Sequence, residues 1–122
     1  MTPRGAIGAF RETCPCGIGE DTLFSWLSEL EGTIREELTR THEGTEDPRE
    51  LSMATDADAE LTAPSPYSGI YPAYLRMKCD LFYSDTEHYG ISSAVFASAW
   101  QDFVNWYNRQ NMPAQRANSL KV

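Results

Sequence analysis

The stretch from Thr86 to Asn111 constrains the fold more than any other part of the chain. Seven of its positions recur at alternating steps of four and three residues: Tyr89, Ser93, Phe96, Trp100, Phe103, Tyr107 and Gln110. This spacing places five aromatic side chains along one face of a helix. Ser84 precedes Glu87 at the spacing of a capping box, with Asp85 as a rival N-cap, and Pro113 ends the helix. Such an aromatic helix needs extensive cover from the rest of the chain or from a neighbouring subunit.

Two further helices are predicted from apolar periodicity. Asp21 is expected to cap a helix that runs to about His42. Its apolar stripe is formed by Leu23, Trp26, Leu27, Leu30, Ile34 and Leu38, and its opposite side by Glu29, Glu31, Arg35 and Glu36. A third helix is expected from about Pro66 to Tyr83, with Pro72 tolerated in its first turn. Its apolar surface comprises Ile70, Tyr74, Leu75, Met77, Cys79, Leu81 and Phe82.

The connections complete the predicted architecture. Thr2 and Pro3 fit the N-cap and first position of a short helix that includes Ala6, Ile7 and Phe10. Ser84 and Asp85 form so short a link that the helices on either side should be antiparallel neighbours. The sequence therefore predicts an all-α protein, a small bundle of three to four helices. Residues 1–113 form its domain, and buried positions include Trp26, Leu30, Phe96, Trp100 and Phe103.

The long segment between the second and third helices is acidic. The chain carries a net charge of −8, and Glu20–Glu60 alone holds 13 acidic and 3 basic residues. We expect residues 43–66 to form a long loop, with a short two-stranded ribbon around Thr55–Asp58 as a possible element. The acidic side chains expected on it are Glu43, Glu46, Asp47, Glu50, Asp56, Asp58 and Glu60. Carboxylates at this density repel the phosphates of nucleic acid.

The last nine residues read AQRANSLKV and follow the predicted helix end at Pro113. They contain two bases, no acid and few apolar side chains, which is typical of a flexible tail. Residues 114–122 are therefore expected to act as an extended C-terminal tail. Contacts with a partner would come from Arg116, Leu120, Lys121 and Val122.

No catalytic or metal-binding pattern stands out. Cys14, Cys16 and Cys79 are an odd number of thiols, and the closely spaced first two lack the second cysteine pair typical of structural zinc. We expect reduced, packed or idle thiols, no cofactor and no enzyme activity.

The sequence lacks a signal-peptide pattern and a run of about 20 apolar residues, so a soluble intracellular protein is expected. Tyr67, Tyr71, Trp106 and Tyr107 are read as anchors of a subunit interface.

Three segments together resemble the head–tail connector (adaptor, or head completion) proteins of tailed bacteriophages. They read WLSELEGTI at Trp26–Ile34, PYSGIY at Pro66–Tyr71 and WYNR at Trp106–Arg109. Their order and spacing resemble that family from about Ala6 to Pro113. The chain departs from the pattern at Cys14–Gly17, where such proteins typically have a turn without cysteines.

The resemblance implies a non-enzymatic virion protein that forms a ring of twelve copies below the portal. It implies three partners: the portal, the next tail or stopper protein, and neighbouring copies of the same chain. Double-stranded DNA would pass through the ring without specific binding, and no membrane would be involved. Such a protein is found in the host cytoplasm during assembly and then at the head–tail interface of the virion. The alternative is a soluble, acidic, helical module that binds or regulates one protein partner.

Overall fold

The computed structural model describes residues 1–14, 17–41 and 58–110. The elements are α1 (Pro3–Thr13), α2 (Glu20–Thr41), the 3₁₀ turn η1 (Tyr67–Gly69), α4 (Ile70–Phe82) and α5 (Thr86–Gln110). These described parts contain four α-helices and no strand. The predicted class, a small all-α protein, is therefore confirmed. The expected ribbon lies mostly outside the described residues, and the end that is described, Glu60–Thr62, is irregular.

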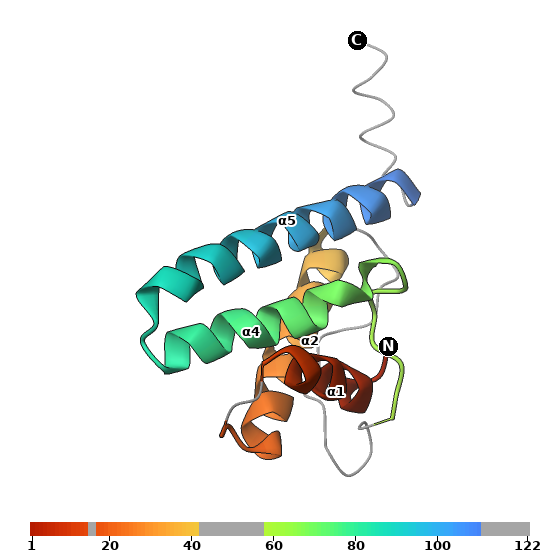
Figure 1. Ribbon diagram of the computed structural model, residues 1–122. Helices are drawn as coiled ribbons and strands as arrows, with labels where there is room; N and C mark the ends of the chain where they lie inside the picture. The colour runs from red at the N-terminus through yellow and green to blue at the C-terminus, as the bar shows by residue number, and fades with distance from the viewer. Residues whose placement is uncertain (15–16, 42–57, 111–122) are drawn as a thin grey trace.

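Helix α4 is the centre of the molecule. It packs against α1, α2 and α5, whereas α5 packs mainly on α4 and η1. Figure 1 shows α4 and α5 side by side and antiparallel, joined by a tight connection. This arrangement confirms the relation predicted from the short link. Helix α1 lies across the other side of α4, and α2 passes behind it.

One apolar core fills the space around α4. Its largest fully buried side chains come from every helix, and they include Phe10, Leu23, Leu27, Ile34, Ile70, Tyr71, Leu75 and Phe103. Of the residues expected to be buried, Leu30 and Phe103 lie in this core. Trp26, Phe96 and Trp100 are only partly buried and pack against its edge. The aromatic stripe of α5 is therefore half covered by its own chain.

The beginnings of the first two helices follow from local chemistry. The Thr2 side chain accepts a hydrogen bond of 3.1 Å from the Gly5 N–H, and Pro3 occupies the first turn, as predicted. Helix α2 begins two residues earlier than a cap at Asp21 predicts, at Glu20. Asp21 therefore lies in the first turn, where its charge favours the positive end of the helix dipole, and is not the cap.

The predicted third helix is divided into two parts. Residues Tyr67–Gly69 form the 3₁₀ turn, and the α-helix begins only at Ile70. Pro72 then falls in the first turn of α4, where its missing N–H removes no intrahelical bond, as expected.

The cap of α5 is Asp85 and not Ser84. The Asp85 carboxylate accepts the His88 N–H at 3.1 Å, which satisfies an otherwise unpaired donor at the start of the helix. Ser84 has a positive φ of 55° and belongs to the turn that ends α4. The capping-box alternative built on Ser84 and Glu87 is therefore wrong.

Candidate functional site

The most conspicuous surface feature is a set of large hydrophobic side chains on the α4–α5 hairpin. Five of them are between 53% and 63% exposed: Leu81, Phe82, Tyr83, Ile91 and Val95. The first three lie at the closed end of the hairpin, and the other two lie on the first half of α5. Leu81 and Phe82 belong to the apolar surface predicted for the third helix, and the described chain leaves both exposed. Large exposed apolar side chains concentrated on one unit are typical of interaction surfaces.

An open groove of about 220 Å³ follows the hairpin between its two helices. Its lining consists of Ala73, Arg76, His88, Ile91, Ser92 and Val95. Ala73, Ile91 and Val95 supply apolar walls, while Arg76 and His88 place basic groups beside them. The groove can therefore take an apolar side chain together with a polar or acidic group of a partner.

Asp85 fixes the position and charge of His88. Its second carboxylate oxygen lies 2.6 Å from the His88 Nδ1. This hydrogen bond, together with the carboxylate charge, raises the pKa of His88 above its ordinary value. The pKa of Asp85 is lowered, first by the bond from the His88 backbone N–H and then by the imidazole. His88 is thus favoured in its charged form next to the groove.

A second polar pair lies on α4 at the same groove. The Arg76 Nε and the Asp80 Oδ2 are 3.6 Å apart, and both atoms are buried. Neither atom has a hydrogen-bond partner among the described residues. Both atoms can therefore still form a hydrogen bond. Leaving a buried polar atom without one is costly.

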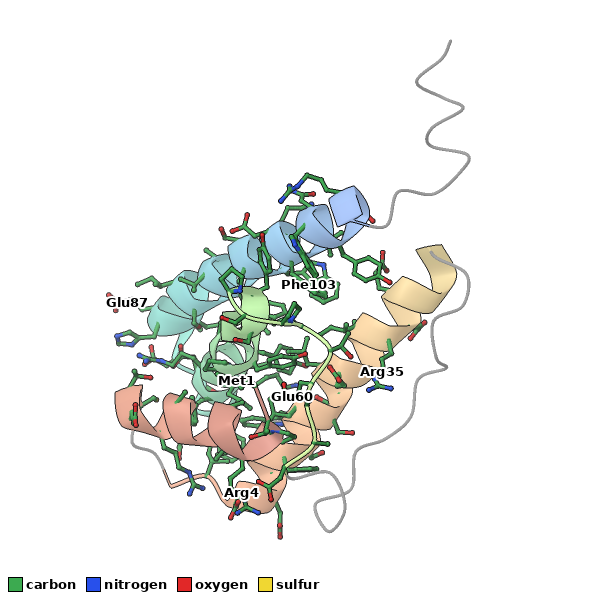
Figure 2. The ribbon with its side chains drawn as sticks, turned by 90° about the vertical axis from the view of Figure 1, so that its right-hand side faces the viewer. Met1, Arg4, Arg35, Glu60, Glu87 and Phe103 are labelled. Atoms are coloured by element: carbon green, nitrogen blue, oxygen red, sulfur yellow. The ribbon has the colours of Figure 1, made fainter. Side chains whose placement is uncertain are left out.

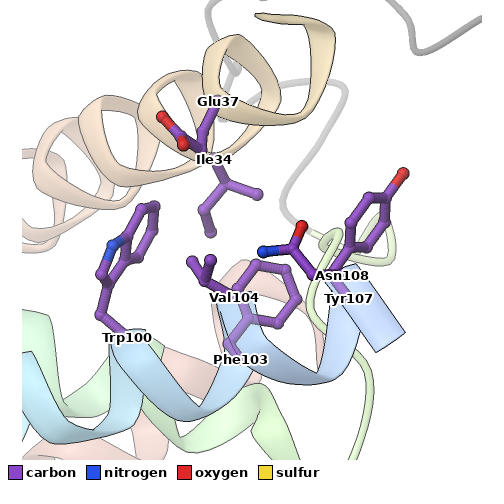
Figure 3. A pocket seen from close by; sticks show the side chains of 7 residues that line it. All are labelled: Ile34, Glu37, Trp100, Phe103, Val104, Tyr107 and Asn108. Atoms are coloured by element: carbon purple, nitrogen blue, oxygen red, sulfur yellow. The ribbon is translucent and has the colours of Figure 1, made fainter. Parts of the chain in front are cut away.

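A smaller cleft of about 30 Å³ lies between the second half of α2 and the last turns of α5. Figure 3 shows Ile34 and Glu37 of α2 opposite Trp100, Phe103 and Val104 of α5. This volume accommodates the end of one aliphatic side chain and is too small for a substrate of ordinary size.

A third feature is a buried carboxylate, Glu31, which has no exposed surface. It accepts hydrogen bonds from the Tyr71 hydroxyl and from both the N–H and the hydroxyl of Thr62, each at 2.9 Å. Burial, followed by the negative charge of Glu31, raises the pKa of the Tyr71 hydroxyl well above its usual range. The sequence analysis assigned Glu31 to the polar side of α2, and this assignment is wrong. Its spacing from Leu27 and Ile34 is the signal that could have found it.

Two of the predicted loop acids are described, and both contact the N-terminal region. Asp58 forms an ion pair with Arg4 at 3.0 Å, and Glu60 pairs with the amino group of Met1 at 2.9 Å. Both pairs are exposed, and Figure 2 labels Met1, Arg4 and Glu60 along the same side of the molecule. The other predicted acids, Glu43, Glu46, Asp47, Glu50 and Asp56, lie outside the described residues.

The predicted interface aromatics separate into two groups. The rings of Tyr67 and Trp106 lie against each other with centroids 5.1 Å apart and planes tilted by 31°, and Trp106 also contacts Tyr107. These three rings are partly buried at the edge of the core. Tyr71 has no exposed surface, so its assignment to a subunit interface is corrected to a core position. The tail residues Arg116, Leu120, Lys121 and Val122 lie outside the described residues.

Across residues 1–14, 17–41 and 58–110, no group of three or more histidine, cysteine or acidic side chains is placed to hold a metal ion. Cys14 and Cys79 are not in a disulfide, as expected, whereas Cys16 is outside the described residues. Among the described helices, none combines the length and the apolarity needed to cross a membrane.

No family model, curated protein or solved structure matches the chain. The function of the protein is therefore inferred from its own residues and from the resemblance of its three sequence segments.

Proposed function

We propose that the protein is a structural subunit of a ring that joins the portal of a tailed bacteriophage to the next tail or stopper protein. The observation that carries the proposal is the set of exposed hydrophobic side chains on the α4–α5 hairpin, with the groove beside it. A chain whose core is already filled gains by covering such side chains with another protein. In a closed ring, this surface meets a different surface of the neighbouring copy.

The charge distribution supports the same function. The acidic segment Glu20–Glu60 gives the chain much of its negative charge, and such a segment facing a channel does not retain a translocating duplex. We propose that the long acidic loop of residues 43–66 lies toward the channel. We further propose that the basic residues of the segment 114–122 contact the portal. The protein would accordingly be located first in the host cytoplasm and then at the head–tail interface.

The alternative is an acidic helical module that binds one protein partner and is not part of a virion. The exposed hairpin also suits this function, because a single partner can cover it. The two functions differ in stoichiometry and in their dependence on a portal. The ring requires many copies on a portal, whereas the module forms a monomer or a twofold dimer with one partner.

Light scattering coupled to size-exclusion chromatography tests the proposal, on the chain alone and after mixing with the portal. Ile91→Asp places a charge in the apolar wall of the groove, and we expect it to prevent multi-copy assembly on the portal. Ala97→Asp introduces the same charge on the same helix at an exposed position that does not line the groove, and it should assemble normally. Circular dichroism confirms that both variants fold.

The outcomes separate the alternatives. Loss of assembly only in Ile91→Asp supports the ring and its surface. Normal assembly of both variants means that the groove is not the contact surface. A wild-type chain that never joins a portal, and forms a one-to-one complex with another protein through Ile91, indicates the binding module.

A further inference from the structure

An irregular segment, residues 58–63, lies against the helices without belonging to one; we call it the strap. Its attachment centres on Glu31. One carboxylate oxygen accepts both the N–H and the hydroxyl of Thr62, and the other accepts the Tyr71 hydroxyl, all at 2.9 Å. The Tyr71 oxygen in turn accepts the Ala63 N–H at 2.9 Å. Two consecutive backbone N–H groups of the strap therefore depend on one acidic side chain of α2, directly or through Tyr71.

The hydrogen-bond donors around residue 31 are matched by a carboxylate, which only accepts, and not by an amide, which also donates. The Thr62 N–H can only donate, and the Tyr71 hydroxyl has its oxygen engaged by Ala63 and its hydrogen directed at Glu31. The Arg35 Nε lies 3.6 Å from the same carboxylate oxygen as Thr62 and adds positive charge. An amide at this position would direct an N–H group toward another donor. A buried donor left without an acceptor is more costly than a missing bond at the surface.

The other attachments of the strap, within the described residues, include two buried side chains, Leu61 and Ala63, which belong to the apolar core. The Leu61 N–H donates to the Met1 carbonyl at 3.0 Å. The Asp58–Arg4 and Glu60–Met1 pairs are exposed, and exposed ion pairs contribute little to stability. The helices also pack directly on one another, with α4 in contact with α1, α2 and α5.

We propose that the strap is a detachable segment whose attachment is controlled by the Glu31 carboxylate. Loss of this acceptor releases residues 58–63 while α1, α2, α4 and α5 remain packed. The strap is the point at which the chain returns from its long acidic segment to the helices. Glu31 thereby determines whether this end of the acidic segment is held against α2 and α4 or is free to occupy a new position. The proposal does not depend on ring formation.

Amide hydrogen exchange, read residue by residue by NMR, tests the proposal in Glu31→Gln. The Thr62 and Ala63 amides should exchange at least about tenfold faster than in the wild type, as expected for the loss of a buried charge-assisted bond. Core amides of α4, such as that of Leu75, should keep their wild-type rates. Glu29→Gln is the matched control: it lies on the same helix, and its exposed carboxylate accepts a long bond of 3.4 Å from Tyr74 and pairs with Lys78 at 3.6 Å. This control should leave the strap protected.

Two substitutions at Thr62 keep the test decisive if Glu31→Gln fails to fold. Thr62→Val removes the hydroxyl donor and should accelerate exchange of the strap amides alone, whereas Thr62→Ser retains the donor and should resemble the wild type. Uniform acceleration across the helices, in Glu31→Gln or in Thr62→Val, overturns the proposal because the segment is then part of the global unfolding unit. Unchanged exchange of Thr62 and Ala63 overturns it as well.

Discussion

Replacement of Phe103 by alanine is the sharpest test of how α5 is held. Phe103 is 1% exposed and is the one large side chain of α5 that the described residues bury completely. Its ring lies 6.2–6.4 Å, between centroids, from those of Trp100, Trp106 and Tyr107. Truncation of a buried phenylalanine costs about 3–5 kcal/mol, and each lost aromatic pair contributes part of that cost. For a domain with a total stability of about 5–15 kcal/mol, this is a large fraction.

The expected result is a fall in melting temperature of about 10–20 °C, measured by circular dichroism and supported by denaturant titration. Ile91→Ala is the matched control, because Ile91 lies on the same helix with 63% of its surface exposed. It should lose at most about 1 kcal/mol. Equal melting temperatures for the two variants would refute the assignment of Phe103 as the residue that fixes α5 to the core.

Three other outcomes are expected. Asp85→Asn should lower the pKa of His88 toward its ordinary value, as measured by NMR titration; an unchanged titration would mean that Asp85 is not the cause of the raised pKa. Because that pKa is raised on folding, the favourable His88–Asp85 interaction is complete below the unfolded-state value of about 6.5 and is lost as pH rises through the folded-state value. Duplex DNA should bind very weakly at physiological salt, and submicromolar binding with a steep salt dependence would contradict a passive channel. Removal of residues 114–122 should leave the fold intact and abolish portal binding, and a truncated protein that still assembles would place the attachment elsewhere.

Much of the helical architecture could be predicted from the sequence, because it depends on local rules. The Thr2 cap, the tolerated Pro72 and the antiparallel pairing across Ser84–Asp85 all follow from interactions within a few residues. The choice between Ser84 and Asp85 as the cap of α5 did not follow. Both residues have suitable side chains, and only the backbone geometry decides which one reaches the His88 N–H.

The polar centre at Glu31 shows where local rules fail. An acidic residue on a helix is normally exposed, so Glu31 was assigned to the polar side of α2. Its spacing from Leu27 and Ile34 indicated the opposite, buried side. The partners that make its burial tolerable, Thr62 and Tyr71, are 31 and 40 residues away along the chain. The exposed hairpin side chains were missed for a related reason. The apolar character of Leu81 and Phe82 indicates that burial of their side chains is favourable. It does not indicate whether the same chain or a partner protein buries them.

These sequence separations have a consequence for the order of folding. The α4–α5 pair closes a short connection at small entropic cost, whereas the Glu31 contacts must close loops of 31 and 40 residues. We therefore expect the pair to form before the folding barrier and the Glu31 bonds to form after it. In stopped-flow measurements, Glu31→Gln should then leave the rates of global refolding and unfolding nearly unchanged, because the strap detaches without unfolding the helices. A slower refolding limb would instead place these distant bonds in the folding nucleus.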